Sequence, residues 1–411
     1  MRRVRHAARG ISLTVVLTCA LGTMALGTAS KAPCASGHYS DGRQYRWLCY
    51  TDVVPLLGTE QLQGGRLPFI DACAPSENNC DEYPVITMYL MRVAAWVGHS
   101  FESFYFTNAA IMTGFALLIT GCLWLLVGRR ALWFALAPTL LIYGTVNWDL
   151  AAVAAATAAL VAWAKRRDGL AGVLIGVGAA TKFYPALLVV PLFLQGLQDL
   201  EPDRSVRMLW WSVGSWIAVN LPFVLVAPGA WGEFFRFNGA RTPDFDSWWY
   251  IACHHLPSTC TSISNVNLLA LSAFLGGSFV AIFWKLHRDP SFPRWTIGLP
   301  LLICFLVTNK VYSPQYSLWL LPWFAMTMPH LRRFVAFELA DVAVFVTRFW
   351  FFGTYIGVMV LPQQWWFEVA LGVRALVLLW CLIAWVRDEM PPLPQLVPAA
   401  RAPTPAPALV A

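Results

Sequence analysis

Charged side chains are scarce in this chain of 411 residues. They account for 12% of the sequence and hydrophobic residues for 58%, whereas soluble domains carry roughly 25% charge. The sequence also lacks a glycine-rich phosphate loop, the His and Cys spacing of a metal site, and an Asp-x-Asp pair in a basic loop. We therefore predict a polytopic membrane protein with no cofactor, no metal and no nucleic-acid partner, and we do not expect a soluble nucleotide-sugar donor.

Long apolar segments alternate with short polar loops. The first, residues 11–29, follows an arginine-rich N-terminus, and we interpret it as an uncleaved membrane helix because it is long for the apolar part of a signal peptide. The others lie at about 104–127, 131–146, 148–164, 170–182, 184–197, 208–228, 264–286, 296–309, 315–329, 334–353 and 364–386. Several are too short to span without tilting or breaking. The pattern predicts an all-α polytopic membrane protein with about twelve transmembrane helices.

Lysine and arginine gather in alternate loops. They are concentrated in both termini and in residues 128–130, 165–168, 198–207, 285–294 and 330–333. By the positive-inside rule these loops and both termini are cytoplasmic, in a multi-pass protein of the plasma membrane. The opposite loops, chiefly 30–103 and 229–265, are then extracytoplasmic. Residues 1–390 are expected to form one membrane domain, and the proline- and alanine-rich residues 391–411 a disordered cytoplasmic tail.

The long first outer loop contains two further apolar stretches. Residues 84–98 could be taken for another span, but counting them would place Arg129 and Arg130 outside the cell. We therefore predict an amphipathic helix at the membrane interface, with Arg92 on its polar face. A second interfacial helix is expected over residues 53–62.

Six of the ten cysteines lie in the two loops assigned to the outer side. They are Cys34, Cys49, Cys73, Cys80, Cys253 and Cys260. An even set confined to one side indicates an oxidising compartment and up to three disulfides, whose connectivity the sequence leaves open. Cys253 and Cys260 stand alone together in one short loop, and for this reason we expect them to pair.

Lys182 and Lys310 each interrupt an apolar stretch, and a proline follows shortly after each of them. An ammonium at the membrane centre costs roughly 2.5 to 3.5 kcal/mol on insertion scales. We therefore expect the two lysines to line a wet cavity or to bind an anion, and the alternative is that they snorkel to the outer surface. In the predicted topology both face the outer side, as does Asp52.

Several acids could serve as a base on that side. Asp52 lies in the first outer loop between Cys49 and an apolar stretch, which would hold its carboxylate near the membrane surface. Asp149 lies in a polar turn between two helices and is the runner-up, although it could be only a helix N-cap. Asp71 and Glu82 follow, and all of these acids could instead be solvated loop charges.

Two arginines, Arg348 and Arg374, lie inside late apolar segments. An unpaired guanidinium is improbable there. We expect the partner to be a phosphate or one of the acids Asp341 and Glu368.

Five short stretches carry a resemblance. They are Cys49-Tyr-Thr-Asp-Val-Val-Pro-Leu, Glu82-Tyr-Pro-Val, Asn147-Trp-Asp-Leu, Ala179-Ala-Thr-Lys-Phe-Tyr-Pro and Asn309-Lys-Val-Tyr-Ser-Pro-Gln-Tyr. Together they resemble glycosyltransferase family 87, an actinobacterial group of GT-C type enzymes that includes polyprenol-phosphate-mannose-dependent α-mannosyltransferases. The resemblance implies a GT-C type fold, an extracytoplasmic active site, a polyprenyl-phosphate sugar donor, a glycolipid or polysaccharide acceptor and inversion at the anomeric carbon.

The resemblance also implies roles for individual residues. Asp52 would be the general base, because in GT-C enzymes the base is typically an acid of the first outer loop. From the residues themselves, we expect the donor phosphate to be bound by Lys182, Lys310 and Arg348, and the substrates by Glu82, Tyr83, Tyr312 and Gln315. The cysteine-rich insertion around residues 72–81 departs from the family pattern and leaves the acceptor open.

The chemistry is consistent with these roles. A single displacement needs one carboxylate to take the acceptor proton and cations to stabilise the phosphate that leaves. The alternative function is a transporter or flippase of lipid-linked sugars, because broken helices and intramembrane charges also mark transport pathways. The chain shows no internal sequence repeat, which argues against it.

Overall fold

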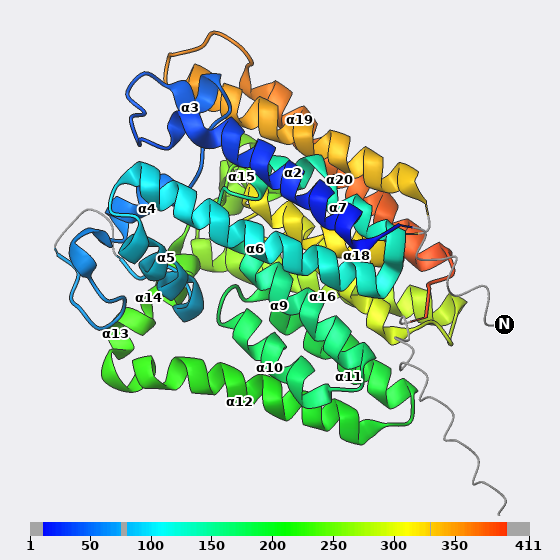
Figure 1. Ribbon diagram of the computed structural model, residues 1–411. Helices are drawn as coiled ribbons and strands as arrows, with labels where there is room; N and C mark the ends of the chain where they lie inside the picture. The colour runs from blue at the N-terminus through cyan, green and yellow to red at the C-terminus, as the bar shows by residue number, and fades with distance from the viewer. Residues whose placement is uncertain (1–10, 75–79, 329, 393–411) are drawn as a thin grey trace, which may run out of the picture.

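Five helical stretches are long and apolar enough to cross a membrane in this computed structural model, which describes residues 11–74, 80–328 and 330–392. They are Leu13–Cys34, which begins with α2 (Leu13–Lys31), Phe101–Ala135, which begins with α6 (Phe101–Val127), α12 (Pro202–Val226), α16 (Ile263–Arg288) and α20 (Gln364–Arg387). All regular elements in the described ranges are helices. Figure 1 shows them side by side in one bundle. The chain is therefore an all-α polytopic membrane protein, and the total of about twelve spans stays a prediction.

The remaining apolar segments are shorter, broken or more charged. They form α7 (Ala131–Ala135), α8 (Pro138–Tyr143), α9 (Asp149–Ala164), α10 (Asp168–Ala179), η4 (Tyr184–Leu188), α11 (Val189–Gln198), η6 (Arg294–Ile297), α17 (Gly298–Thr308), η7 (Pro314–Trp319), α18 (Leu321–Thr327) and α19 (Leu331–Tyr355). Four of these elements, α8, η4, η7 and α18, have a proline in their first two positions. Proline has no N–H to donate and restricts the residue before it, so the helices restart at these points.

Short helices cover one end of the bundle, at the left of Figure 1. They include α3 (Arg43–Arg46), α4 (Val53–Thr59), α5 (Val85–Val97), α13 (Pro228–Trp231), α14 (Glu233–Ala240) and α15 (Trp248–His255). Helices are thus present at both positions predicted to be interfacial, as α4 and α5. The side chain of Trp96 in α5 is 72% exposed, as expected for an aromatic residue that contacts lipid headgroups.

Small residues allow the closest helix contacts. A Cβ added to Gly172 in α10 would clash with the backbone oxygen of Met208 in α12. A Cβ added to Gly176 would clash with the backbone oxygen of Ser212. The two glycines are four residues apart, the spacing that lets two membrane helices approach backbone to backbone. This contact supports α10, whose C-terminal end leads to Lys182.

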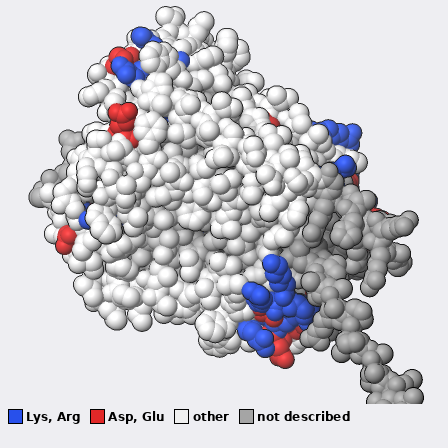
Figure 2. All heavy atoms as spheres, in the orientation of Figure 1, with Lys and Arg blue, Asp and Glu red and all other residues white. Residues whose placement is uncertain are grey.

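Charge is distributed unevenly over the surface. Figure 2 shows the charged side chains of one face mostly toward its ends, with a broad band of other residues between them. Large apolar side chains such as Leu225, Phe279 and Leu376 are more than half exposed. Exposed apolar surface of this kind is unfavourable in water and favourable in lipid, which agrees with a membrane protein.

Three disulfides lie in the loops assigned to the outer side. They join Cys34 to Cys49, Cys73 to Cys80, and Cys253 to Cys260. The last is the pair predicted from the sequence. The remaining cysteines, Cys19, Cys122, Cys304 and Cys381, are free.

Candidate active site

A cavity of about 730 Å³ lies at the end of the bundle that the short helices cover. Its walls come from α4, α14, α19 and the two breaks that precede η4 and η7. The sequence-predicted residues that line it are Asp52, Glu82, Tyr83, Lys182, Lys310, Gln315 and Arg348. Residues from distant parts of the chain are therefore brought together around one space large enough for a sugar and a phosphate.

Asp52 occupies the first position before α4, but its side chain makes no capping hydrogen bond. Its backbone N–H donates to the carbonyl oxygen of Val146 at 3.0 Å, which fixes the loop against the turn before α9. The carboxylate accepts hydrogen bonds at Oδ2 from Asn147 Nδ2 at 2.9 Å and from Gln315 Nε2 at 3.3 Å. Asp52 is half-buried and lines the cavity, so it is available to a bound hydroxyl group.

Tyr50 lies beside this carboxylate. The negative charge of Asp52, and then burial, raise the pKa of Tyr50 well above its ordinary value. Tyr50 is therefore a neutral hydroxyl at physiological pH, and its ring stacks against Phe349 with 5.1 Å between the ring centroids. The wall next to Asp52 is aromatic and uncharged on this side.

Lys182 lies between α10 and η4. Its Nζ is 3.5 Å from Asp149 Oδ2 and lies over the rings of Tyr83 and Tyr316, 5.1 and 5.5 Å from their centroids. Asp149 is completely buried and accepts a second contact, a hydrogen bond from Trp319 Nε1 at 2.8 Å. Asp149 does not line the cavity, so the structure places it behind Lys182 rather than beside Asp52 as a second exposed carboxylate.

Lys310 lies in the break between α17 and η7. Its Nζ donates to the backbone carbonyl oxygens of Gly239 at 3.1 Å and Arg241 at 2.7 Å. These acceptors carry no formal charge, so they satisfy the ammonium without neutralising it. Lys310 therefore ties the loop that follows α14 to the cavity, and the hydrogen bonds described for its ammonium include no carboxylate that would take the place of a bound anion.

Arg348 projects from α19 and is already paired with acids. Its Nε is 2.6 Å from Asp246 Oδ1, and its Nη2 is 3.6 Å from Asp244 Oδ1. Burial raises the pKa of Asp246 to about 6, although Arg348 and then Arg374 act in the opposite direction. Arg241 adds a third contact, 3.3 Å from Asp244 Oδ2. Much of the charge of Arg348 is thus balanced inside the protein.

The expectation about acid partners holds for one arginine and not for the other. Arg374 Nη1 lies 3.1 Å from Asp341 Oδ1, which confirms one of the two acids named from the sequence. Glu368 instead accepts from His255, at 3.1 Å. The acids beside Arg348 come from the loop after α14, and sequence reasoning missed them because that loop is far away in the chain.

Tyr312 and Asp71 lie away from the cavity wall. The Tyr312 hydroxyl is 3.1 Å from Ser317 Oγ, and its ring lies under the guanidinium of Arg374 at 3.8 Å. Asp71 is exposed, and its carboxylate accepts from the backbone N–H of Leu67 at 2.7 Å. The structure therefore brings neither residue to Asp52, and their proposed roles in the reaction have no support from contact.

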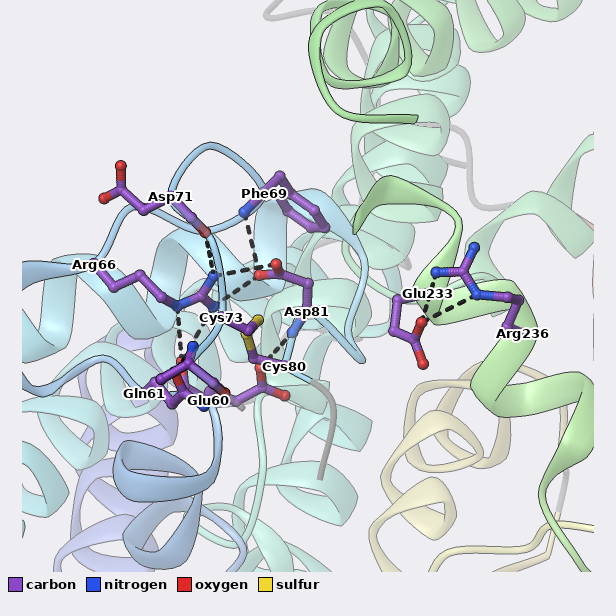
Figure 3. Close-up of a disulfide and its surroundings, with 11 residues drawn as sticks. Glu60, Gln61, Arg66, Phe69, Asp71, Cys73, Cys80, Asp81, Glu233 and Arg236 are labelled. Atoms are coloured by element: carbon purple, nitrogen blue, oxygen red, sulfur yellow. Dashed lines mark hydrogen bonds and ion pairs between the residues drawn. A yellow bond between two sulfur atoms is a disulfide. The ribbon is translucent and has the colours of Figure 1, made fainter. Parts of the chain in front are cut away.

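Figure 3 shows the Cys73–Cys80 disulfide next to a polar cluster that includes Glu60, Arg66 and Asp81. Glu60 also lines the cavity. Asp81 follows the disulfide and forms a bidentate ion pair with Arg66, with contacts of 2.8 and 3.1 Å. The Asp81 N–H donates to Glu60 Oε2 at 2.7 Å. Cys73, Cys80 and Asp81 are close enough to suggest metal ligands, but cysteines in a disulfide have no thiolate to offer.

Glu60 and Glu82 place two carboxyl groups on the cavity wall. Burial raises the pKa of Glu60 to about 8, and the hydrogen bond from Asp81 only partly offsets it. Burial and the nearby Glu233 also raise the pKa of Glu82. Sequence reasoning did not single out Glu60, since nothing in its local pattern distinguishes it from a solvated loop acid.

Comparison with known proteins gives one match. Residues 82–314 match the family model described as glycosyltransferase family 87. A search of curated proteins finds no match. The matched range contains Asn147, Lys182 and Lys310 and begins after Asp52.

Proposed function

The chain belongs to glycosyltransferase family 87, and from this premise we propose that it transfers mannose from a polyprenyl-phosphate donor to a glycolipid or polysaccharide of the cell envelope. As a membrane protein of this family it is a membrane glycosyltransferase. The identity of the donor, the sugar and the acceptor belongs to the proposal. The observation that carries it is the gathering of Asp52, Lys182 and Lys310 around one cavity.

Asp52 is the general base in this proposal. It takes the proton from an acceptor hydroxyl while the acceptor oxygen forms a bond to the anomeric carbon. The bond from that carbon to the phosphate oxygen breaks at the same time, and polyprenyl phosphate leaves with the electron pair. One displacement inverts the anomeric configuration. Support comes from the position of Asp52 in the cavity wall, with its carboxylate bonded to amides and not to a cation.

Lys310 and Lys182 bind the phosphate that leaves. The hydrogen-bond acceptors of the Lys310 ammonium are carbonyl oxygens, whereas the Lys182 ammonium pairs with the carboxylate of the buried Asp149. We assign Lys310 the larger part of the stabilisation for this reason. Arg348 contributes only if the phosphate competes with Asp244 and Asp246 for its guanidinium.

Glu82 and Tyr83 bind the acceptor or the sugar in this proposal. Both line the cavity. Carboxylates and hydroxyls are suitable partners for sugar hydroxyl groups, because each can form directional hydrogen bonds in a partly buried site. Gln315 remains a candidate substrate contact because it hydrogen-bonds Asp52. Tyr312 is not proposed to contact the substrate, because its hydroxyl bonds Ser317 and has no hydrogen bond to Asp52.

The orientation in the membrane is also proposed. The two long loops that contribute to the cavity wall, residues 30–103 and 229–265, also contain the three disulfides, which favours an extracytoplasmic site. Thiol labelling of intact cells after mild reduction should reach Cys253 and Cys260. If these thiols react only after the membrane is breached, the orientation is wrong.

The function is tested with purified protein and polyprenyl-phosphate-mannose. Release of polyprenyl phosphate that depends on an envelope acceptor, and that is lost in Asp52→Asn, is the expected result. Movement of the intact lipid-linked sugar across a vesicle membrane, without release, would instead favour the transporter or flippase.

A further inference from the structure

The side chain of Asn147 is almost completely buried between Asp52 and Tyr83, and every polar group of its amide is used. Its Nδ2 donates to Asp52 Oδ2 at 2.9 Å and to the hydroxyl oxygen of Tyr83 at 3.1 Å. Its Oδ1 accepts from the backbone N–H of Trp148 at 2.7 Å. An amide has two N–H donors, so both are committed, and the Trp148 contact fixes which end of the amide faces Asp52.

We propose that Asn147 is a positioning residue that sets Asp52 as the proton acceptor and Tyr83 as a hydrogen-bond donor toward the substrate. This inference rests on the proposed function, because it concerns the same sugar-transfer site. Asn147 itself need not touch a substrate.

The first consequence concerns the two oxygens of Asp52. Oδ2 accepts from both Asn147 and Gln315, and a carboxylate oxygen offers about two lone-pair positions. Oδ2 is therefore occupied by the two amides, and the Tyr50 hydroxyl also hydrogen-bonds the Asp52 carboxylate. A carboxylate has about four lone-pair positions, so Oδ1 still has one with which to take the acceptor proton as the new C–O bond forms. Two donors on one oxygen also stop the carboxylate from rotating, so the base is held in one orientation before the substrate arrives.

The second consequence concerns Tyr83. Its hydroxyl oxygen accepts from Asn147, so its own hydrogen points elsewhere. Tyr83 lines the cavity, and burial and then the charge of Asp52 raise its pKa well above the ordinary value. A neutral hydroxyl whose oxygen is already used is available to donate its hydrogen to a substrate oxygen.

Several other titratable groups surround Asp52 and could contribute to the pH dependence of turnover. Those that interact electrostatically with it are Tyr39, Tyr50, Tyr83, Asp149 and Arg348. The three tyrosines have raised pKa values and stay neutral. Asp149 is held by Lys182, and Arg348 by Asp244 and Asp246. Removing the amide of Asn147 alters neither of these two sets of ion pairs directly, and of the three tyrosines only Tyr83 loses a hydrogen bond to it.

The test is the pH profile of polyprenyl phosphate release from polyprenyl-phosphate-mannose by full-length enzyme. Asn147→Ala removes a hydrogen bond of the kind that favours the charged form of a carboxylate over its protonated form. We expect turnover near neutral pH to fall by at least about tenfold, and the acid limb to move upward by about one pH unit. Gln315→Met should move the limb in the same direction by less, because its contact is longer.

Asn108→Ala is the matched control. Asn108 is as buried as Asn147 and bonds the indole of Trp148 from α6, with 2.7 Å between Asn108 Oδ1 and Trp148 Nε1, but it has no hydrogen bond to Asp52 or Tyr83. Its acid limb should match that of the unmodified enzyme. Tyr83→Phe should lower turnover without moving the limb.

An unmoved acid limb in both Asn147→Ala and Gln315→Met would overturn the positioning of Asp52, even if turnover falls. Should Asn147→Ala fail to fold, Gln315→Met alone decides this point. Normal turnover in Tyr83→Phe would overturn the donor role. The Asp52→Asn enzyme separates these failures from failure of the proposed function: if it is inactive, the base assignment stands and only the positioning inference is lost.

Discussion

Lys182 Nζ lies 3.5 Å from Asp149 Oδ2, at the boundary between the cavity and the protein core. Asp149 is fully buried, whereas Lys182 keeps 11% of its side chain exposed. The buried carboxylate fixes the partly exposed ammonium in place and offsets its positive charge, so the net charge of the pair is lower than that of the lysine alone. The pair also explains how both residues tolerate an apolar environment, since each is the counter-ion of the other.

The pair predicts that Asp149→Asn acts through Lys182. Without its partner, Lys182 should lose its position over Tyr83 and Tyr316, so the KM for the donor should change more than the turnover at saturation. We expect a rise in KM of about tenfold. Steady-state kinetics with varied donor would measure it. An inactive Asp149→Asn enzyme beside a nearly normal Asp52→Asn enzyme would instead move the base to Asp149.

Asp52→Asn should abolish most turnover. The amide keeps the shape of the carboxylate but cannot accept a proton, so turnover should fall by on the order of a hundredfold or more, with little change in donor affinity. Donor binding and single-turnover sugar transfer should be measured separately. Loss of donor binding with unchanged single-turnover rate would contradict the assignment of Asp52 as base.

Lys310→Met should weaken donor binding or turnover by well over about tenfold, because it removes a charge-assisted contact worth roughly 1.5 to 3 kcal/mol. Lys182→Met is predicted to do the same, with a smaller effect. Lys285→Met is the control, since Lys285 is also buried and bonds a backbone carbonyl, that of Asp388 at 2.7 Å, but does not line the cavity. Full activity in both Lys310→Met and Lys182→Met would mean that the two lysines have only a structural role.

The raised pKa of Glu60 predicts that the free energy of unfolding falls as pH rises. Its pKa in the folded protein, about 8, lies above the ordinary 4.5. Between these values the folded state holds a proton that the unfolded chain releases, so stability present at low pH is lost toward pH 8, by at most about 1.4 kcal/mol per pH unit. Glu60→Gln keeps an acceptor for Asp81 and does not titrate. Its melting temperature should therefore fall less than that of the unmodified protein over this range; equal slopes would rule out the contribution.

The disulfides predict a fixed count of free thiols. With three bridges and free Cys19, Cys122, Cys304 and Cys381, alkylation of the denatured, unreduced chain should add four labels by intact mass. Reduction should raise the number to the ten cysteines of the sequence. Each short loop should contribute no more than roughly 3 kcal/mol. Labels on Cys253 and Cys260 without reduction would contradict their pairing.

The general class of the protein could be predicted from the sequence because hydropathy is a local property. Segments such as 208–228 and 264–286 are apolar along their whole length, and they form the long helices α12 and α16. The Cys253–Cys260 pair was predictable for a similar reason, since the two residues are isolated in one short loop. The prolines also marked the breaks before η4 and η7 correctly.

Parts of the candidate site could be predicted only as a list of residues. Asp52, Lys182 and Lys310 stood out because a charge is costly next to apolar sequence, and the structure places all three around one cavity. Their individual partners did not follow from the list. Nothing near Lys310 in the chain indicates that its ammonium bonds the carbonyl of Arg241.

The sequence by itself determined that the chain is an apolar helical membrane protein, and it predicted a charged site on the side that carries the disulfides. Only the tertiary structure decided that Arg348 pairs with Asp246, that Asp149 lies behind Lys182, and that Asn147 bonds both Asp52 and Tyr83. Hydropathy and helix breaking depend on neighbouring residues, so they can be read along the chain. The partner of a buried charge depends on which helices come together, and that is set by packing between segments distant in sequence.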